Sequence, residues 1–184
     1  QLHCREDFCK AIAGVRAEAK IHIKDGKKSI AIEQGELQLT EYGISGIPVF
    51  QLSGQVNLLL REQKGKEVSA EIDFLPEFSA EEWKLFAEER MSEIAKRTSE
   101  TVEAFFTGML HKKLMLLFIK MAGLKTNAFV GDVRKEQLME VFCLCRKFTL
   151  HITGSNSYDN AQICAGGVSM MEVSPTLEAL KVKG

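Results

Sequence analysis

The sequence lacks an excess of charge of either sign. Its 184 residues include 24 basic and 25 acidic side chains, a formal net charge of −1 at pH 7. A protein that binds a nucleic acid backbone needs a clustered positive face. The composition therefore gives no support to nucleic-acid binding, and we expect no nucleic-acid partner.

Long apolar runs are also missing. The longest apolar stretch, Leu114 to Ile119, is flanked by lysines and falls far short of the roughly 18 residues that span a bilayer. The first residues, Gln1 to Asp7, lack the apolar core of a signal peptide. We therefore expect no membrane partner and a cytoplasmic protein.

The cysteines do not form a disulfide framework or a zinc motif. There are five, an odd number, at widely scattered positions: Cys4, Cys9, Cys143, Cys145 and Cys164. Secreted frameworks use even numbers, and zinc sites use closely spaced pairs with further Cys or His ligands. We expect reduced, mostly buried cysteines and no metal site.

Standard catalytic motifs are absent as well. The sequence has no G-x-S-x-G, P-loop or H-E-x-x-H, and no dinucleotide fingerprint follows a strand. His22 and His151 stand alone on predicted strands and are interpreted as structural. We assign no catalytic side chain, and the lack of clustered titratable residues disfavours a small independent enzyme.

What the chain does contain is alternation typical of strands. With 45% hydrophobic and 27% charged residues it has the composition of a globular protein. Period-2 patterns predict an antiparallel meander with turns at Asp25-Gly26 and Gln34-Gly35. Its strands, and the later ones predicted in the same way, are 17–24, 28–33, 36–40, 67–74 and 148–153.

A glycine-rich segment, 40–48, separates this meander from a predicted helix over 48–60. Ser45 is a candidate N-cap, and Pro48 suits the first helical turn. A helix start preceded by glycines offers free backbone N–H groups to an anionic or carbonyl-bearing ligand. A simple turn is the alternative explanation.

The region 76–147 is predicted to be helical. Ser79 and Glu82 form a capping box, and Asp132 is a candidate N-cap for a last helix that ends near Lys147. Charge is uneven along the region, net −4 over 77–103 and net +5 over 104–147. Solvated helix faces are the simpler interpretation, and a docking surface for a charged partner is the other.

After this region the strand pattern returns, followed by a polar loop, a strand, the pair Gly166-Gly167 and another strand. Paired glycines allow the backbone to approach a flat ligand closely, although a bulge would also explain them. We therefore predict an α+β fold, a small antiparallel β-barrel-like domain interrupted by a helical subdomain. The parts are 1–75, 76–147 and 148–184.

Three stretches carry a resemblance to a known family. They are GELQLTEYGISGIP (35–48), IDFLP (72–76) and ITGSNSYDNAQICAGGV (152–168). The sequence resembles bacterial FAD-dependent oxidoreductases akin to bile-acid dehydro-reductases and aminoacetone oxidases. It departs at Ile47, where the family often has Pro directly after Gly. The resemblance covers nearly the whole chain.

The resemblance implies that this chain is the barrel and helical insertion of a larger flavoprotein, without its Rossmann-type FAD domain. FAD is then a cofactor of the full-length protein, with NAD(P)H a compatible partner in the redox reaction, and is not expected on the fragment alone. The implied partners are the FAD-binding domain of the same polypeptide and a small-molecule substrate.

The resemblance also implies site residues. Those expected near the cofactor are Ala165, Gly166, Gly167, Val168, Ser45 and Gly46, and those expected to line the substrate pocket are Asn156 and Tyr158. The fragment by itself is expected to have no activity. The alternative is a stand-alone protein-interaction module that binds a partner through its barrel and charged helical surface.

Overall fold

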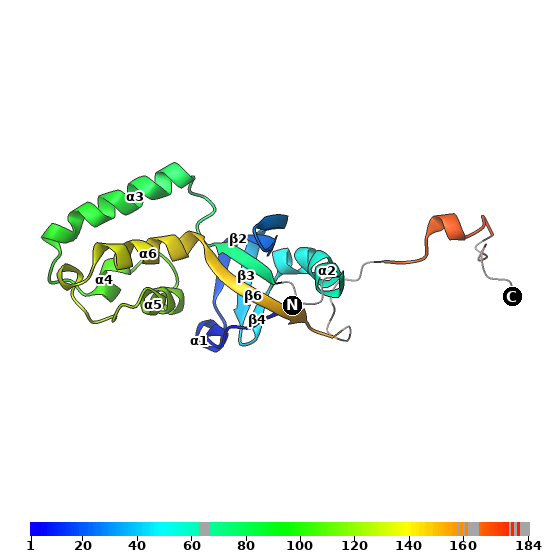
Figure 1. The fold of residues 1–184 in the computed structure, drawn as a ribbon, viewed down its shortest axis with the longest axis horizontal. Coiled ribbons are helices and arrows are strands. Elements are labelled where there is room, and N and C mark those ends of the chain that lie inside the picture. Colours follow the sequence, from blue (N-terminus) through cyan, green and yellow to red (C-terminus); the bar gives the residue numbers. More distant parts are fainter. Residues whose placement is uncertain are drawn as a thin grey trace.

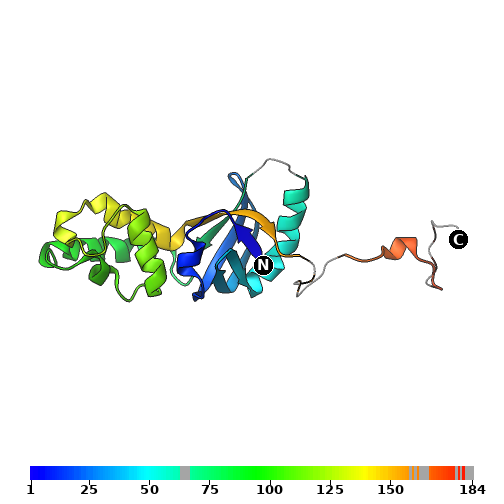
Figure 2. The same ribbon diagram turned by 90° about the horizontal axis from the view of Figure 1, so that it is seen from below.

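The computed structural model describes residues 1–62, 67–157, 159, 161, 166–176, 178 and 180. Figure 1 shows a barrel of strands with a separate group of helices on one side of it. On the other side the C-terminal segment runs away from the barrel, and Figure 2 shows the same arrangement after a 90° turn. No helix among the described residues is long and apolar enough to cross a membrane.

Six antiparallel strands form a closed barrel in the order β1-β4-β3-β2-β5-β6, with β6 pairing back onto β1. They are β1 (Leu2–Cys4), β2 (Arg16–Asp25), β3 (Lys28–Thr40), β4 (Gly43–Gly46), β5 (Val68–Asp73) and β6 (Phe148–Ser155). Buried residues alternate with more exposed ones along β2, β5 and β6, as in a barrel whose interior is filled by side chains. The predicted α+β fold with a barrel and helices is confirmed.

The predicted turn at Gln34-Gly35 is wrong, because β3 runs without a break from Lys28 to Thr40. Gly35 has a positive φ of 154°, and a Cβ there would lie 3.4 Å from Cδ of Pro48. The positive φ favours glycine here, and a Cβ would make only an ordinary contact with helix α2 (Ile47–Glu62). Helix α2 is the helix predicted over 48–60.

The other helices are α1 (Cys9–Ile12), α3 (Ala80–Ser92), α4 (Val102–Phe106), α5 (Lys112–Met121) and α6 (Lys135–Arg146). The predicted capping box at the start of α3 is confirmed, with Ser79 and Glu82 bonding reciprocally. The predicted N-cap at Asp132 is wrong. Asp132 ends a short 3-10 helix (Val130–Asp132), and α6 begins three residues later, after Arg134.

Helices α3 to α6 lie between β5 and β6 in the sequence, so the chain crosses twice between barrel and helices. An ion pair ties the two crossings together. The Arg146 guanidinium donates two hydrogen bonds to Oδ2 of Asp73, at 2.9 and 2.7 Å, and a third to the Ser79 carbonyl at 3.0 Å. Both side chains are largely buried, Asp73 13% and Arg146 19% exposed. The backbone N–H of Phe74 donates to the Cys145 carbonyl at 3.0 Å.

Aromatic packing runs through the same junction. Phe74 directly after β5, Phe118 on α5 and Phe148 at the start of β6 form a triangle with ring centroids 5.1 to 6.0 Å apart. All three rings are buried. The apolar interiors of the barrel and of the helical group are therefore continuous at this point.

We predict that Asp73→Asn lowers the free energy of unfolding by about 2 kcal/mol, because it leaves the Arg146 guanidinium largely buried beside a neutral group. The matched control is Glu36→Gln. It removes a carboxylate from the exposed Arg16 pair at 3.4 Å, where a change of less than about 0.5 kcal/mol is expected. Urea denaturation of both variants measures the difference. Equal losses of unfolding free energy in the two variants would contradict a larger contribution from the junction ion pair than from the exposed pair.

Candidate functional site

Three of the predicted site residues, Ser45, Gly46 and Asn156, lie at one rim of the barrel. Leu2 of β1 pairs with Ile44 of β4 on one side and with Ser155 of β6 on the other. Because both neighbours run antiparallel to β1, each continues toward the same end of the barrel. Ser45 and Gly46 therefore lie at the same rim as Asn156. Tyr158 and Ala165 lie outside the described residues.

Ser45 and Gly46 are part of a strand, and the prediction of a glycine-rich loop with Ser45 as N-cap is wrong. Ser45 pairs with Gln38 and Gly46 with Leu37 of β3, and the Ser45 side chain is 4% exposed. Helix α2 begins one residue beyond the strand. A Cβ on Gly46 would lie 2.3 Å from the Glu36 carbonyl oxygen, at a φ of +109°. Gly46 is thus required by the packing of β4 on β3.

Asn156 belongs to a half-buried hydrogen-bonded cluster with Gln1, His3 and Tyr42. The Asn156 amide oxygen accepts from Nε2 of His3 at 2.5 Å, its Nδ2 donates to Oε1 of Gln1, and the Tyr42 hydroxyl donates to the same oxygen at 2.7 Å. The rings of His3 and Tyr42 are stacked with centroids 4.8 Å apart. The cluster fixes the Asn156 amide in one orientation.

Sequence reasoning did not identify His3 and Tyr42. Three segments that are distant in sequence supply the cluster, and only the pairing of β1 with β4 and β6 brings them together. The groups present are an imidazole, a phenol and amides. They can donate and accept hydrogen bonds to a polar ligand atom, and they include no carboxylate or thiol that could act as a nucleophile.

Gly166, Gly167 and Val168 belong to the C-terminal segment, which Figure 1 shows running away from the barrel. Both glycines have positive φ, 115° and 143°, and a Cβ on either would meet no atom within 4 Å. Val168, Met170 and Met171 are 75%, 82% and 87% exposed. The strand predicted after the glycines is wrong, because Met170–Glu172 is a short 3-10 helix that Ser169 caps.

The polar contact between His151 and Glu6 has a structural explanation. On β6, Nδ1 of His151 lies 2.5 Å from Glu6, whose carboxylate also accepts the His151 backbone N–H at 3.1 Å, so the pair fastens β6 to the turn after β1. The pKa of His22 is lowered, mainly by burial. Among the residues that the structure describes, no three His, Cys, Asp or Glu side chains are placed to hold a metal ion.

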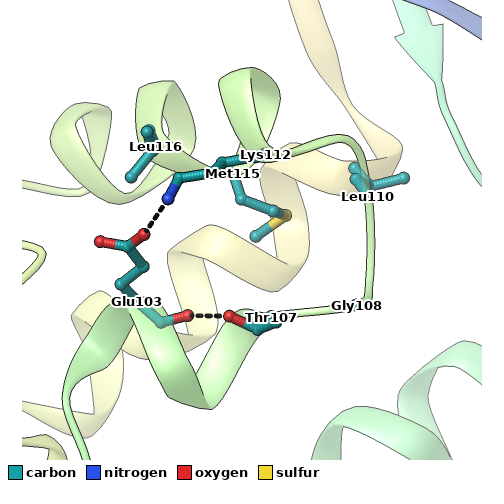
Figure 3. Close-up of a pocket in the computed structure, with 7 residues that line it drawn as sticks. All are labelled: Glu103, Thr107, Gly108, Leu110, Lys112, Met115 and Leu116. Atoms are coloured by element: carbon teal, nitrogen blue, oxygen red, sulfur yellow. Dashed lines mark hydrogen bonds and ion pairs between the residues drawn. The ribbon is translucent and has the colours of Figure 1, made fainter.

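A small cavity of about 150 Å³ lies on the helical group, between α4 and α5 (Figure 3). Lys112 and Glu103 form an ion pair across it at 2.8 Å, and the Thr107 hydroxyl donates to the Glu103 carbonyl at 2.8 Å. Leu110, Met115 and Leu116 supply its apolar lining. None of its lining residues is a site residue predicted from the sequence, so the barrel rim is the stronger candidate site.

Two comparisons with known proteins each match most of the chain. Residues 1–163 match the family described as HI0933-like protein barrel and H2TH domain. The 3-dehydro-bile acid delta(4,6)-reductase of Clostridium scindens is 37% identical over 181 residues, 98% of this chain and 43% of the relative. The chain thus spans less than half the length of the curated relative it matches. The predicted resemblance to bile-acid dehydro-reductases is confirmed.

We predict that Gly46→Ala lowers the free energy of unfolding by about 3 kcal/mol, because the new methyl combines a disfavoured φ with a backbone clash against Glu36. Gly14→Ala is the control. Gly14 has a φ of +84° but no atom within 4 Å of an added Cβ, so only about 1 kcal/mol is expected. Thermal and urea unfolding of both variants would test the prediction. A smaller loss of unfolding free energy for Gly46→Ala than for Gly14→Ala would contradict the close packing of β4 on β3.

Proposed function

This chain belongs to the HI0933-like family, and from that membership we propose that it is the substrate-side domain inserted in a longer flavin-dependent oxidoreductase. In this proposal FAD is held mainly by a Rossmann-type domain outside the chain, and the barrel covers the flavin cleft. The flavin supplies the redox chemistry, while the residues of this chain bind, orient and shield. The cytoplasm is the proposed compartment.

One observation carries the proposal: the exposed apolar segment after the paired glycines. Val168, Met170 and Met171 lie close together in the sequence, and each is at least three-quarters exposed. Contiguous apolar side chains in water mark surfaces that another structure covers. We infer that this segment packs on the FAD-binding domain of the same polypeptide.

The glycines before that segment suit the cofactor. Gly166 and Gly167 carry no side chains and have open space where a Cβ would stand. Main chain of this kind can lie directly against a flat aromatic ring system such as the flavin. We propose that residues 165–168 contact FAD, and that Ser45 and Gly46 support the same cleft from the rim.

The polar cluster at the rim is proposed to meet the substrate. Asn156 is oriented by His3 and Gln1, so its amide has a fixed direction before a ligand arrives. Such prior ordering lowers the entropic cost of binding. Asn156, together with Tyr158, is proposed to hydrogen-bond a small-molecule substrate, and no side chain of this chain is assigned a catalytic role.

We predict that Gly167→Val in the longer polypeptide lowers the flavin content of the purified protein at least about tenfold, equivalent to about 1.4 kcal/mol or more of binding. The branched side chain would occupy the space proposed for the ring system. Gly108→Val is the matched control, because Gly108 also has positive φ, +91°, and open space around it but lies in the helical group.

The measurement is the ratio of flavin absorbance, at roughly 450 nm, to protein absorbance. We expect this ratio to fall for Gly167→Val and to stay at the parent value for Gly108→Val. Unchanged flavin in the Gly167 variant would contradict the proposed contact. Equal loss in both variants would indicate a general effect on folding.

A further inference from the structure

Helix α2 packs on the barrel with one side and leaves the other side in water. It contacts β3, and its inner side is buried, with exposed fractions of 0 to 2% for Val49, Leu52 and Val56. The sequence of this helix is unusual for one that is exposed on its outer side. Residues 47–60 include no charged side chain, and the charged residues of α2 are confined to its end, at Arg61 and Glu62.

The outer side of α2 is a continuous uncharged strip along one helical face. Its exposed residues, which we call the outer strip, are Ile47, Gln51, Gly54, Gln55 and Leu58. Ile47 and Leu58 are 67% and 57% exposed, and they lie three helical turns apart, about 16 Å. A helix face in water normally carries charged and polar side chains. The outer strip is therefore atypical of a solvated surface.

Helix α3 shows how a solvated helix of this fold is composed. Six of its 13 residues are charged: Glu81, Glu82, Lys84, Glu88, Glu89 and Arg90. It also exposes a leucine, Leu85, to almost the same extent as Leu58, 59% against 57%. Exposure of a leucine is thus common to both helices, and the difference between them is charge. Depletion of charged side chains is a property of the buried centres of protein interfaces.

Gly54 lies at the centre of the outer strip. A glycine inside a helix costs about 1 kcal/mol relative to alanine. No described atom lies within 4 Å of the place where its Cβ would stand, so packing within the described structure does not require a glycine there. A glycine does allow another element to approach the helix backbone closely. A neighbour outside the described residues would account for both the glycine and the missing charge.

The position of α2 indicates which neighbour this is. Ile47 follows Gly46 directly, so α2 begins at the rim that carries the candidate site. Figures 1 and 2 both show α2 on the side of the barrel toward the C-terminal segment and away from the helical group. The C. scindens relative is matched over 43% of its length, so more than half of that protein lies outside the match.

We infer that the outer strip of α2 is a docking surface for the remainder of the longer polypeptide. The identity of this partner as the FAD-binding domain rests on the proposed function. The partner surface is expected to be apolar opposite Ile47 and Leu58 and to offer hydrogen bonds to the amides of Gln51 and Gln55. Amides can be buried with a hydrogen-bond partner at a much lower cost than charges. The contact gives the barrel a second attachment besides the apolar segment 168–171.

The test is the alkylation rate of single cysteines placed on two helices of the longer polypeptide. Leu58→Cys lies in the outer strip, and Leu85→Cys on α3 is the matched control, because the two leucines are almost equally exposed. Trypsin releases the two positions in peptides 29–61 and 85–90, and neither contains a native cysteine. Mass spectrometry therefore follows each position separately. We expect N-ethylmaleimide to modify position 58 at least about tenfold more slowly than position 85.

A second variant tests close approach at the centre of the outer strip. Gly54→Leu, combined with Leu58→Cys, replaces the glycine with a better helix former. Circular dichroism checks that the protein is folded. We expect the larger side chain to weaken the docking and to raise the alkylation rate at position 58 at least about threefold. An unchanged slow rate would show that nothing approaches α2 at Gly54, and it would overturn the inferred contact.

Flavin absorbance of the same samples separates this contact from the proposed function. A yellow protein with equal alkylation rates at positions 58 and 85 would overturn the α2 contact and leave the proposed function standing. A colourless protein with slow alkylation at position 58 would support the contact and contradict the proposed identity of the partner. Protection of position 58 that disappears on dilution would show that a second copy covers the outer strip, and it would also overturn the inference.

Discussion

The placement of the helical group against the barrel depends on the ion pair between Asp73 and Arg146. In the sequence, the whole helical group comes between β5 and β6. The barrel is therefore incomplete at the end of β5, and β6 closes it. Arg146 ends the last helix of that group and Asp73 ends β5, so their pairing sets where the returning strand begins. The buried triangle of Phe74, Phe118 and Phe148 then makes the two interiors continuous.

A largely buried ion pair adds little net stability compared with apolar residues that fill the same volume, because both charges must leave water. Its value is geometric. The Arg146 guanidinium contacts both Asp73 and the Ser79 carbonyl, so it connects the end of a strand to the start of α3. Through this connection the helical group is fixed at the end of the barrel opposite the C-terminal segment, as Figure 1 shows.

Local patterns in the sequence predicted much of the fold. Alternation predicted the strands that became β2, β5 and β6, and the Ser79–Glu82 spacing predicted the start of α3. Glycine was the main source of error. Gly35 and Gly46 were interpreted as turn or loop residues, whereas Gly35 adopts a positive φ inside β3 and Gly46 permits β4 to approach β3 closely. A glycine needed for close packing cannot be distinguished locally from one needed for a turn.

The candidate site was predictable only in part. Asn156 was predicted through the family resemblance, and the structure places it at the same rim as Ser45 and Gly46. His3 and Tyr42 gave no local signal, since their relation to Asn156 arises from long-range strand pairing. The most direct measurement is a flavin absorbance spectrum of two purified samples, this chain and the longer polypeptide proposed to contain it. We expect the longer protein to be yellow and this chain to be colourless. Two colourless samples, even after FAD is added, would contradict it and favour a protein-interaction module.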